Sequence, residues 1–144
     1  MRIMIKAGKF QYDLNLDNRI TIIQGNSGTG KTTLANLIDE MNFAPKSYVK
    51  VYPKVQIRRF VKSDLESKNY DKNIIFIIDE GTFERSKEFA RIVNTVENKF
   101  IIITRDSLPT IHYSSDSVNT LEMDGNNVYR LEKRFKENET SWGL

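Results

Sequence analysis

The stretch from residue 25 to residue 32 constrains the fold of this chain more than any other feature of its sequence. It reads Gly-Asn-Ser-Gly-Thr-Gly-Lys-Thr and matches G-x-x-x-x-G-K-[ST], the pattern of the Walker A phosphate-binding loop. An apolar run at residues 20–23 precedes it, and residues 33–38 follow with apolar side chains at helical spacing. The sequence therefore predicts a strand, a glycine-rich loop and a helix in succession, which is the local structure that this motif requires.

The residue types of this loop suit the binding of a nucleoside triphosphate. Glycines let successive backbone N–H groups point at a phosphate without Cβ collisions, and a helix that begins near Lys31 adds its positive end. The Lys31 side chain can reach the β- and γ-phosphates, and the Thr32 hydroxyl can ligate Mg²⁺. The predicted nucleotide-binding residues are Gly25, Asn26, Ser27, Gly28, Thr29, Gly30, Lys31, Thr32 and Thr33.

A second informative stretch, at residues 74–80, ends in two adjacent carboxylates. The apolar residues before Asp79 and Glu80 are typical of a central strand of a parallel sheet that is covered on both faces. Ligands bind at the carboxyl ends of strands in open α/β sheets, so we expect Asp79 to hold Mg²⁺, directly or through water. Glu80 is placed to orient and deprotonate the attacking water. Adjacent acids at a strand end also occur as solvated turn residues.

The rest of the pattern predicts further strands and helices. Strands are expected at residues 2–6, 10–16, 47–52 and 100–103, and a hairpin at 118–123 and 128–131 that turns at 124–127. Helices are expected from Lys31 to near Met41, over residues 57–65 and over residues 83–97. The second of these helices carries Arg58, Arg59 and Lys62 on its polar face, which is either a solvated surface or a contact for nucleic acid, an acidic partner or a second nucleotide.

Composition excludes several classes of protein. A length of 144 residues suits a single domain over 1–144, and a net charge of +3 permits nucleic-acid contact but supports it weakly. The chain has no cysteine, which excludes disulfides and thiolate metal sites. Its single histidine, His112, cannot build a zinc site by itself. No apolar run approaches the roughly 20 residues that span a membrane. We therefore expect a cytoplasmic protein without membrane insertion.

With both motifs placed, the chain resembles the P-loop NTPases that carry a glutamate after the Walker B aspartate, and most closely the ABC-type ATPase domains. Walker B of that family often continues Asp-Glu-Pro-Thr, and residues 79–82 read Asp-Glu-Gly-Thr. The next strand of the family often ends Thr-His-Asp, and residues 104–106 read Thr-Arg-Asp. The resemblance implies an α/β, three-layer P-loop NTPase fold with a mostly parallel central sheet and antiparallel N-terminal and C-terminal strands. It also implies that strand 100–103 lies between strands 20–23 and 74–78.

Departures from the family pattern limit what the resemblance implies. The segment from Thr32 to Asp79 is too short for the family's helical subdomain, and no Leu-Ser-Gly-Gly-Gln-like signature occurs, so the usual sandwich dimer is not expected. Arg105 stands where the switch histidine would be. An arginine can stabilise phosphate charge but cannot act as an acid–base group at neutral pH. Arg58 and Arg59 are alternatives for supplying that charge.

These observations predict a small Mg²⁺-dependent ATPase of the ABC-like P-loop class. Glu80, Lys31 and Arg105 are the expected catalytic residues, and Thr32 and Asp79 are the expected metal ligands. ATP is favoured over GTP because no Asn-Lys-x-Asp motif follows a strand. A nucleotide-binding regulator or inhibitor that acts by binding another protein is the main alternative, and a small phosphotransferase is a further one. The expected partners are ATP and either another protein or a second copy of the chain.

Overall fold

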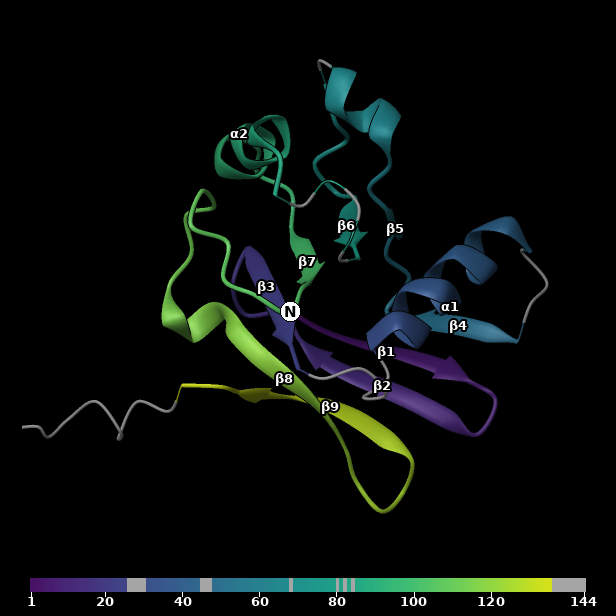
Figure 1. Ribbon diagram of the computed structural model, residues 1–144. Coiled ribbons are helices and arrows are strands. Elements are labelled where there is room, and N and C mark those ends of the chain that lie inside the picture. Colours follow the sequence, from purple (N-terminus) through teal and green to yellow (C-terminus); the bar gives the residue numbers. More distant parts are fainter. Residues whose placement is uncertain are drawn as a thin grey trace, which may run out of the picture.

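The computed structural model describes residues 1–25, 31–44, 48–67, 69–79, 81, 83 and 85–135, without the side chain of Thr32. Within these residues the chain forms a single β-sheet with α-helices packed against it (Figure 1). The strands are β1 (Arg2–Ala7), β2 (Phe10–Asn15), β3 (Ile20–Gln24), β4 (Val49–Tyr52), β5 (Ile57–Arg59), β6 (Ile75–Ile78), β7 (Phe100–Ile103), β8 (Val118–Met123) and β9 (Val128–Lys133). The helices are α1 (Lys31–Phe43), α2 (Lys87–Thr95) and the short 3₁₀ helices η1 (Lys62–Glu66) and η2 (Ser115–Ser117).

The strand order of the sheet is β4-β1-β2-β9-β8-β3-β7-β6-β5. Strands β8, β3, β7, β6 and β5 pair in parallel, whereas the hairpins β1–β2 and β8–β9 are antiparallel. Parallel pairing of β2 with β9 joins the N-terminal hairpin to the C-terminal hairpin. The sheet curls, so that α1 contacts both β4 and β5, the strands at its two edges (Figure 1).

The expected three-layer α/β P-loop NTPase fold is therefore wrong. The chain is mostly β, with nine strands in one curled, mixed half-barrel sheet and only two α-helices, of 13 and 9 residues, in its described part. The two hairpins continue the sheet beyond β3 through the β2–β9 pairing, and the twist of so many strands curls it. One implied feature is confirmed, because β7 lies between β3 and β6.

The two α-helices pack in different hydrophobic clusters on opposite faces of the sheet. Leu34 and Ile38 of α1 belong to one cluster, and Phe89 of α2 belongs to the other. Neighbouring residues of β3 alternate between them, with Ile23 in the α1 cluster and Ile22 in the α2 cluster. The central strands are thus buried on both faces, as their continuous apolar runs predicted.

Residues 57–65 do not form the expected helix. They form strand β5 followed by the start of η1. Ile57 packs in the α1 cluster and Phe60 in the α2 cluster. Residues three apart face the same side of a helix but opposite sides of a strand. The apolar spacing here arises because the extended chain places one apolar side chain on each face of the sheet.

The other predicted elements are found, with small shifts of their bounds. Strand β8 has the predicted bounds, and the hairpin turns at 124–127, where Asp124 Oδ1 accepts hydrogen bonds from the amides of Asn126 (2.8 Å) and Val128 (3.1 Å). Helix α2 begins later than predicted, because Ser86 caps it by accepting a hydrogen bond from the Phe89 amide (3.1 Å).

Candidate functional site

Parallel pairing places the carboxyl ends of β3, β7 and β6 side by side, at the end of the sheet called here its carboxyl edge. Extending the β6–β7 register by one residue places Asp79 level with Ile103. Since β7 separates β6 from β3, Asp79 lies two strand spacings, roughly 10 Å, from β3. Gly25, Asp79 and Arg105 therefore follow three neighbouring strands that end at the same edge, as the sequence predicted.

Several predicted site residues lie outside the described part of the chain. They are Asn26, Ser27, Gly28, Thr29, Gly30 and Glu80, together with Thr82 of the second motif and the side chain of Thr32. Among the predicted site residues that are described, Thr33 is exposed on α1 and Asp79 is half-buried after β6. The geometry of the site is therefore built on Gly25, Lys31, Asp79 and Arg105.

Lys31 is the first residue of α1 and is only 4% exposed. Its Nζ donates a hydrogen bond to the carbonyl oxygen of Gly25, which has a φ of 141°. A buried ammonium group is costly unless opposite charge or hydrogen bonds compensate it. Among the described residues, the hydrogen-bond acceptor of Lys31 is this neutral carbonyl. An anion at the start of α1 would supply the opposite charge, and the free N–H groups of the first helical turn would also bind it.

The loop after β7 is tied to the end of β3 and to the segment before α2. The Thr104 amide donates to the Ile23 carbonyl (3.1 Å), and Gln24 Nε2 donates to the Asp106 carbonyl (3.4 Å). The Asp106 carboxylate forms an ion pair with Arg85 (2.8 Å). These contacts hold the loop beside the end of β3.

A pocket of about 510 Å³ lies beside this loop. Its lining comes from the end of β3, the loop after β7, the start of β8 with the segment before it, and the residues after β9. It includes Gln24, Arg105, Tyr113, Ser115, Arg134 and Phe135. The volume is within the range of small-molecule sites. The sequence motifs indicated Arg105 but not the residues from positions 113–135, because no local pattern shows which distant segments meet at this edge.

Arg58 and Arg59, the other arginines considered for the site, both form ion pairs. Arg58 binds both carboxylate oxygens of Asp64 at 2.9 Å, and its guanidinium lies 4.8 Å from the ring centroid of Phe76. Arg59 Nε donates to Asp39 of α1 at 2.8 Å. Of the three arginines, Arg105 is therefore the one that lines the pocket at the end of β3.

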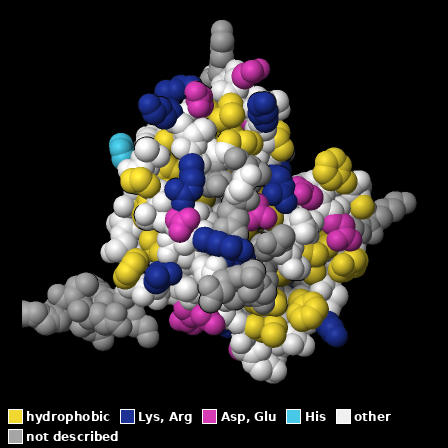
Figure 2. Space-filling view, viewed as in Figure 1, with side chains coloured by type: hydrophobic (Ala, Val, Ile, Leu, Met, Phe, Trp, Pro, Cys, Tyr) yellow, Lys and Arg dark blue, Asp and Glu magenta, His cyan; other side chains and the backbone are white. Residues whose placement is uncertain are grey.

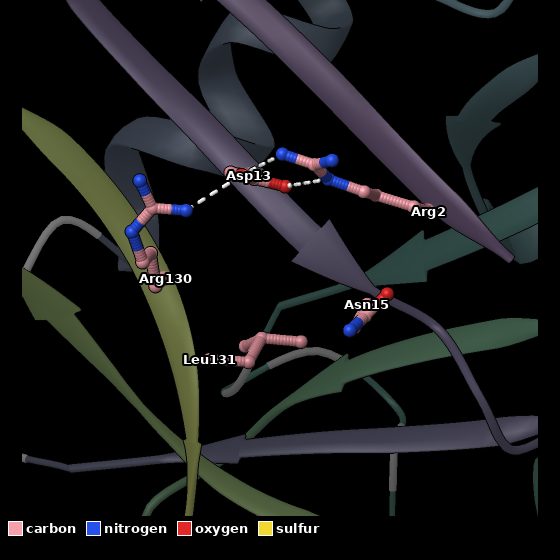
Figure 3. Close-up of a pocket in the computed structure, with 5 residues that line it drawn as sticks. All are labelled: Arg2, Asp13, Asn15, Arg130 and Leu131. Carbon is pink, nitrogen blue, oxygen red and sulfur yellow. Dashed lines mark hydrogen bonds and ion pairs between the residues drawn. The ribbon is translucent and has the colours of Figure 1, made fainter.

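A second pocket, of about 280 Å³, lies over β1, β2 and β9 (Figure 3). The buried Asp13 carboxylate accepts hydrogen bonds from Arg2 (2.6 and 2.7 Å) and from Arg130 (2.6 Å). The hydrogen bonds from Arg2 contribute most to lowering the pKa of Asp13 below its usual range, whereas burial raises it. Both arginines of this pocket point toward one carboxylate (Figure 3), so we interpret the cluster as a link between strands.

The surface also carries exposed aromatic side chains. Figure 2 shows basic and acidic side chains interspersed across the middle of one face, and hydrophobic side chains at its right, over α1 and β4. Phe43 at the end of α1 is 88% exposed, and Tyr48 before β4 and Tyr52 at the end of β4 are 59% and 45% exposed. These three exposed aromatic residues are called here the aromatic edge.

No protein-family model matches this chain, and no solved structure matches it significantly. The relation to P-loop NTPases therefore stays a prediction from the two motifs.

The described residues contain no group of three or more His, Cys, Asp or Glu residues that could hold a metal ion. None of the described helices has the length and apolar character needed to cross a membrane.

Proposed function

We propose that this chain binds Mg²⁺·ATP at the carboxyl edge of β3, β7 and β6 and hydrolyses it. The observation that carries the proposal is the buried side chain of Lys31 at the first turn of α1. Among the described residues, its hydrogen-bond acceptor is the neutral carbonyl of Gly25. A triphosphate would supply the negative charge that a buried ammonium group requires. The match of residues 25–32 to the phosphate-binding loop supports the same ligand on sequence grounds.

Each residue of the proposed site has a separate role. Lys31 and the amides at the start of α1 would bind the β- and γ-phosphates. The Asp79 carboxylate and the Thr32 hydroxyl are oxygen ligands of the kind that Mg²⁺ prefers, and the bound ion offsets charge on the transferring phosphoryl group. Glu80 would orient the attacking water and accept its proton. Arg105 would stabilise negative charge on the phosphates without transferring a proton.

Phosphate release from Mg²⁺·ATP, measured over a series of protein concentrations, tests this function. We expect turnover in the wild-type protein and a loss of about 100-fold or more in Glu80→Gln and in Lys31→Ala. Glu80→Gln should still bind ATP, whereas Lys31→Ala should not. Lys72→Ala is the matched control. Lys72 is exposed in the turn before β6, at the amino ends of the parallel strands and away from the proposed site. Undiminished turnover in Lys31→Ala would contradict the proposal.

A nucleotide-binding regulator that acts by binding another protein is the second candidate. The aromatic edge favours it, because exposed aromatic side chains are enriched where proteins bind one another. Tight ATP binding without turnover would favour this function over hydrolysis. In the cell, a regulator of this kind would keep its activity in Glu80→Gln and lose it in Lys31→Ala.

We further propose that the protein acts in the cytoplasm, because a chain without cysteine needs no oxidising compartment. Nucleic acid is a less favoured partner than another protein. The net charge is only +3, and Arg58 and Arg59, the basic pair considered for such contacts, are held in ion pairs with Asp64 and Asp39.

A further inference from the structure

We infer that the pocket of about 510 Å³ beside the loop after β7 binds the nucleoside part of the nucleotide. The base would contact Arg134 and Phe135, which directly follow β9, and the ring of Tyr113. This inference rests on the proposed function, because it requires the phosphates to lie at Lys31. It adds the part of the site that selects a nucleotide over a bare polyphosphate.

The pocket and the proposed phosphate site are both next to the end of β3. Gln24, the last residue of β3, lines the pocket and directly precedes Gly25. The Gly25 carbonyl accepts the hydrogen bond from Lys31. In the inferred pose, the phosphates replace that carbonyl as the partner of Lys31, and the rest of the ligand extends past Gln24 into the pocket.

The chemistry of the lining suits an aromatic base attached to a polar sugar. Aromatic rings and arginine guanidinium groups both stack on bases, and the Arg134 guanidinium already lies over the Phe135 ring at 5.8 Å. Ser107, Ser115 and the Gln24 amide add polar groups to the same lining. Such groups form hydrogen bonds with base edges and ribose hydroxyls and thereby orient a ligand.

Two contacts hold the walls of the pocket in place. The Tyr113 hydroxyl oxygen accepts a hydrogen bond from the Leu108 amide (3.2 Å), which ties the segment before β8 to the loop after β7. Gln24 Nε2 donates to the Asp106 carbonyl (3.4 Å), which ties the same loop to β3. Tyr113 and Gln24 are therefore positioned by the protein itself, which reduces the ordering cost of binding a ligand.

The ion pairs of this pocket differ from those of the pocket at Asp13. Both pockets are lined by two arginines and one aspartate. In the pocket at Asp13, both arginines are bound to the carboxylate (Figure 3). In the larger pocket, the aspartate of the lining, Asp106, is paired with Arg85, which is not a lining residue. The carboxylate of this lining is thus bound by an arginine from outside the pocket.

Calorimetric titration with Mg²⁺·ATP and with inorganic tripolyphosphate tests the inference. The wild-type protein should bind ATP at least about tenfold more tightly than tripolyphosphate. The double variant Arg134→Ala/Phe135→Ala should lose about tenfold in ATP affinity and keep its affinity for tripolyphosphate. Ser107→Trp, which fills the pocket from the loop side, should show the same selective loss. Arg91→Ala, an exposed arginine of α2, is the control, and circular dichroism checks the fold of each variant.

Titration of Lys31→Ala separates failure of the inference from failure of the proposed function. Loss of both ligands in Lys31→Ala, with unchanged ATP affinity in both pocket variants, would overturn the inference and leave the proposed function in place. An equal loss of both ligands in the pocket variants, or equal wild-type affinity for ATP and tripolyphosphate, would also overturn the inference. Retention of both ligands by Lys31→Ala would overturn the proposed function, and the inference with it.

Discussion

The side chain of Lys31 donates a hydrogen bond to the carbonyl oxygen of Gly25 and so joins the first residue of α1 to the residue that follows β3. This contact places a buried positive charge beside a neutral acceptor. Burying a charge in this way lowers stability, and natural proteins keep such groups mainly where function requires them. Stability and ligand binding should therefore respond to this lysine in opposite directions.

Lys31→Met should raise the free energy of unfolding of the ligand-free protein by about 1 kcal/mol, because it removes the buried charge and keeps most of the side-chain volume. The same variant should lose ATP binding. Urea unfolding measures the first effect through the midpoint, and calorimetric titration measures the second. Lys72→Met at an exposed turn should change neither quantity. A less stable Lys31→Met protein that still binds ATP would contradict this account.

Phe60 lies at the centre of a cluster of aromatic rings. Its ring centroid is between 5.1 and 6.2 Å from those of Tyr70, Phe76, Phe83, Phe89 and Phe100. Phe60→Ala should lower the free energy of unfolding by about 4 kcal/mol, because it leaves a cavity where these rings meet. Phe60→Leu should cost less, about 1 kcal/mol. Phe43→Ala, at a side chain 88% exposed, should have almost no effect in the same urea experiment.

Asp64 should make stability depend on pH. Burial alone would raise the pKa of Asp64, but hydrogen bonds from Arg58 and from the Val61 amide, and the charge of Arg58, lower it in the folded state. A carboxylate with a lowered folded pKa stabilises the protein above its unfolded pKa, about 4, and this contribution is lost as the pH falls through the folded value. Asp64→Asn should therefore cost about 2 kcal/mol at pH 7 and progressively less in acid.

Urea unfolding of wild-type and Asp64→Asn proteins at pH 7 and pH 3 measures this dependence. Glu66→Gln is the matched control, because Glu66 is exposed in the same 3₁₀ helix. Its stability should track that of the wild-type protein at both pH values. The same difference between wild-type and Asp64→Asn proteins at pH 7 and pH 3 would show that the charge of Asp64 does not matter.

Arg130→Ala should loosen β9 without affecting the central strands. The side chain of Arg130 connects β9 to Asp13 of β2, whereas Arg2 connects β1 to the same carboxylate within the N-terminal hairpin. Hydrogen exchange should therefore show faster exchange of the β9 amides in Arg130→Ala, with slow exchange kept in β3 and β7. Arg2→Ala should leave β9 protected. Equal exchange of β9 amides in both variants would contradict the assignment of Arg130 as the link between the hairpins.

Local pattern was enough to predict most of the individual elements. The buried strands appeared as continuous apolar runs, and the C-terminal hairpin was predicted because Asp124 and its neighbours form a turn within a short segment. Residues 57–65 were wrongly predicted as a helix. The same apolar spacing fits a helix and an extended segment whose side chains pack on both faces of the sheet. The spacing of Ile57 and Phe60 alone cannot separate these cases.

Some features of the candidate site could be predicted from the sequence and others could not. Lys31, Asp79 and Arg105 were indicated by sequence, because each follows a recognisable strand or loop motif. The ion pairs that hold Arg58 and Arg59 were not, since Asp64 and Asp39 lie in other elements. The pocket beside the loop after β7 was not indicated either. Its walls come from segments that meet only in the folded sheet.

The sequence by itself determined the apolar faces of the elements, the position of the hairpin turn and the residues of the phosphate-binding motif. Only the tertiary structure decided how the two hairpins join the central strands and how the sheet curls. Asp13 and Arg130 are 117 residues apart in the chain and yet hydrogen-bond across β2 and β9. Side-chain patterns determine which face of a strand is buried, but every strand offers the same backbone hydrogen-bonding groups, so its partner is chosen by the packing of the whole chain.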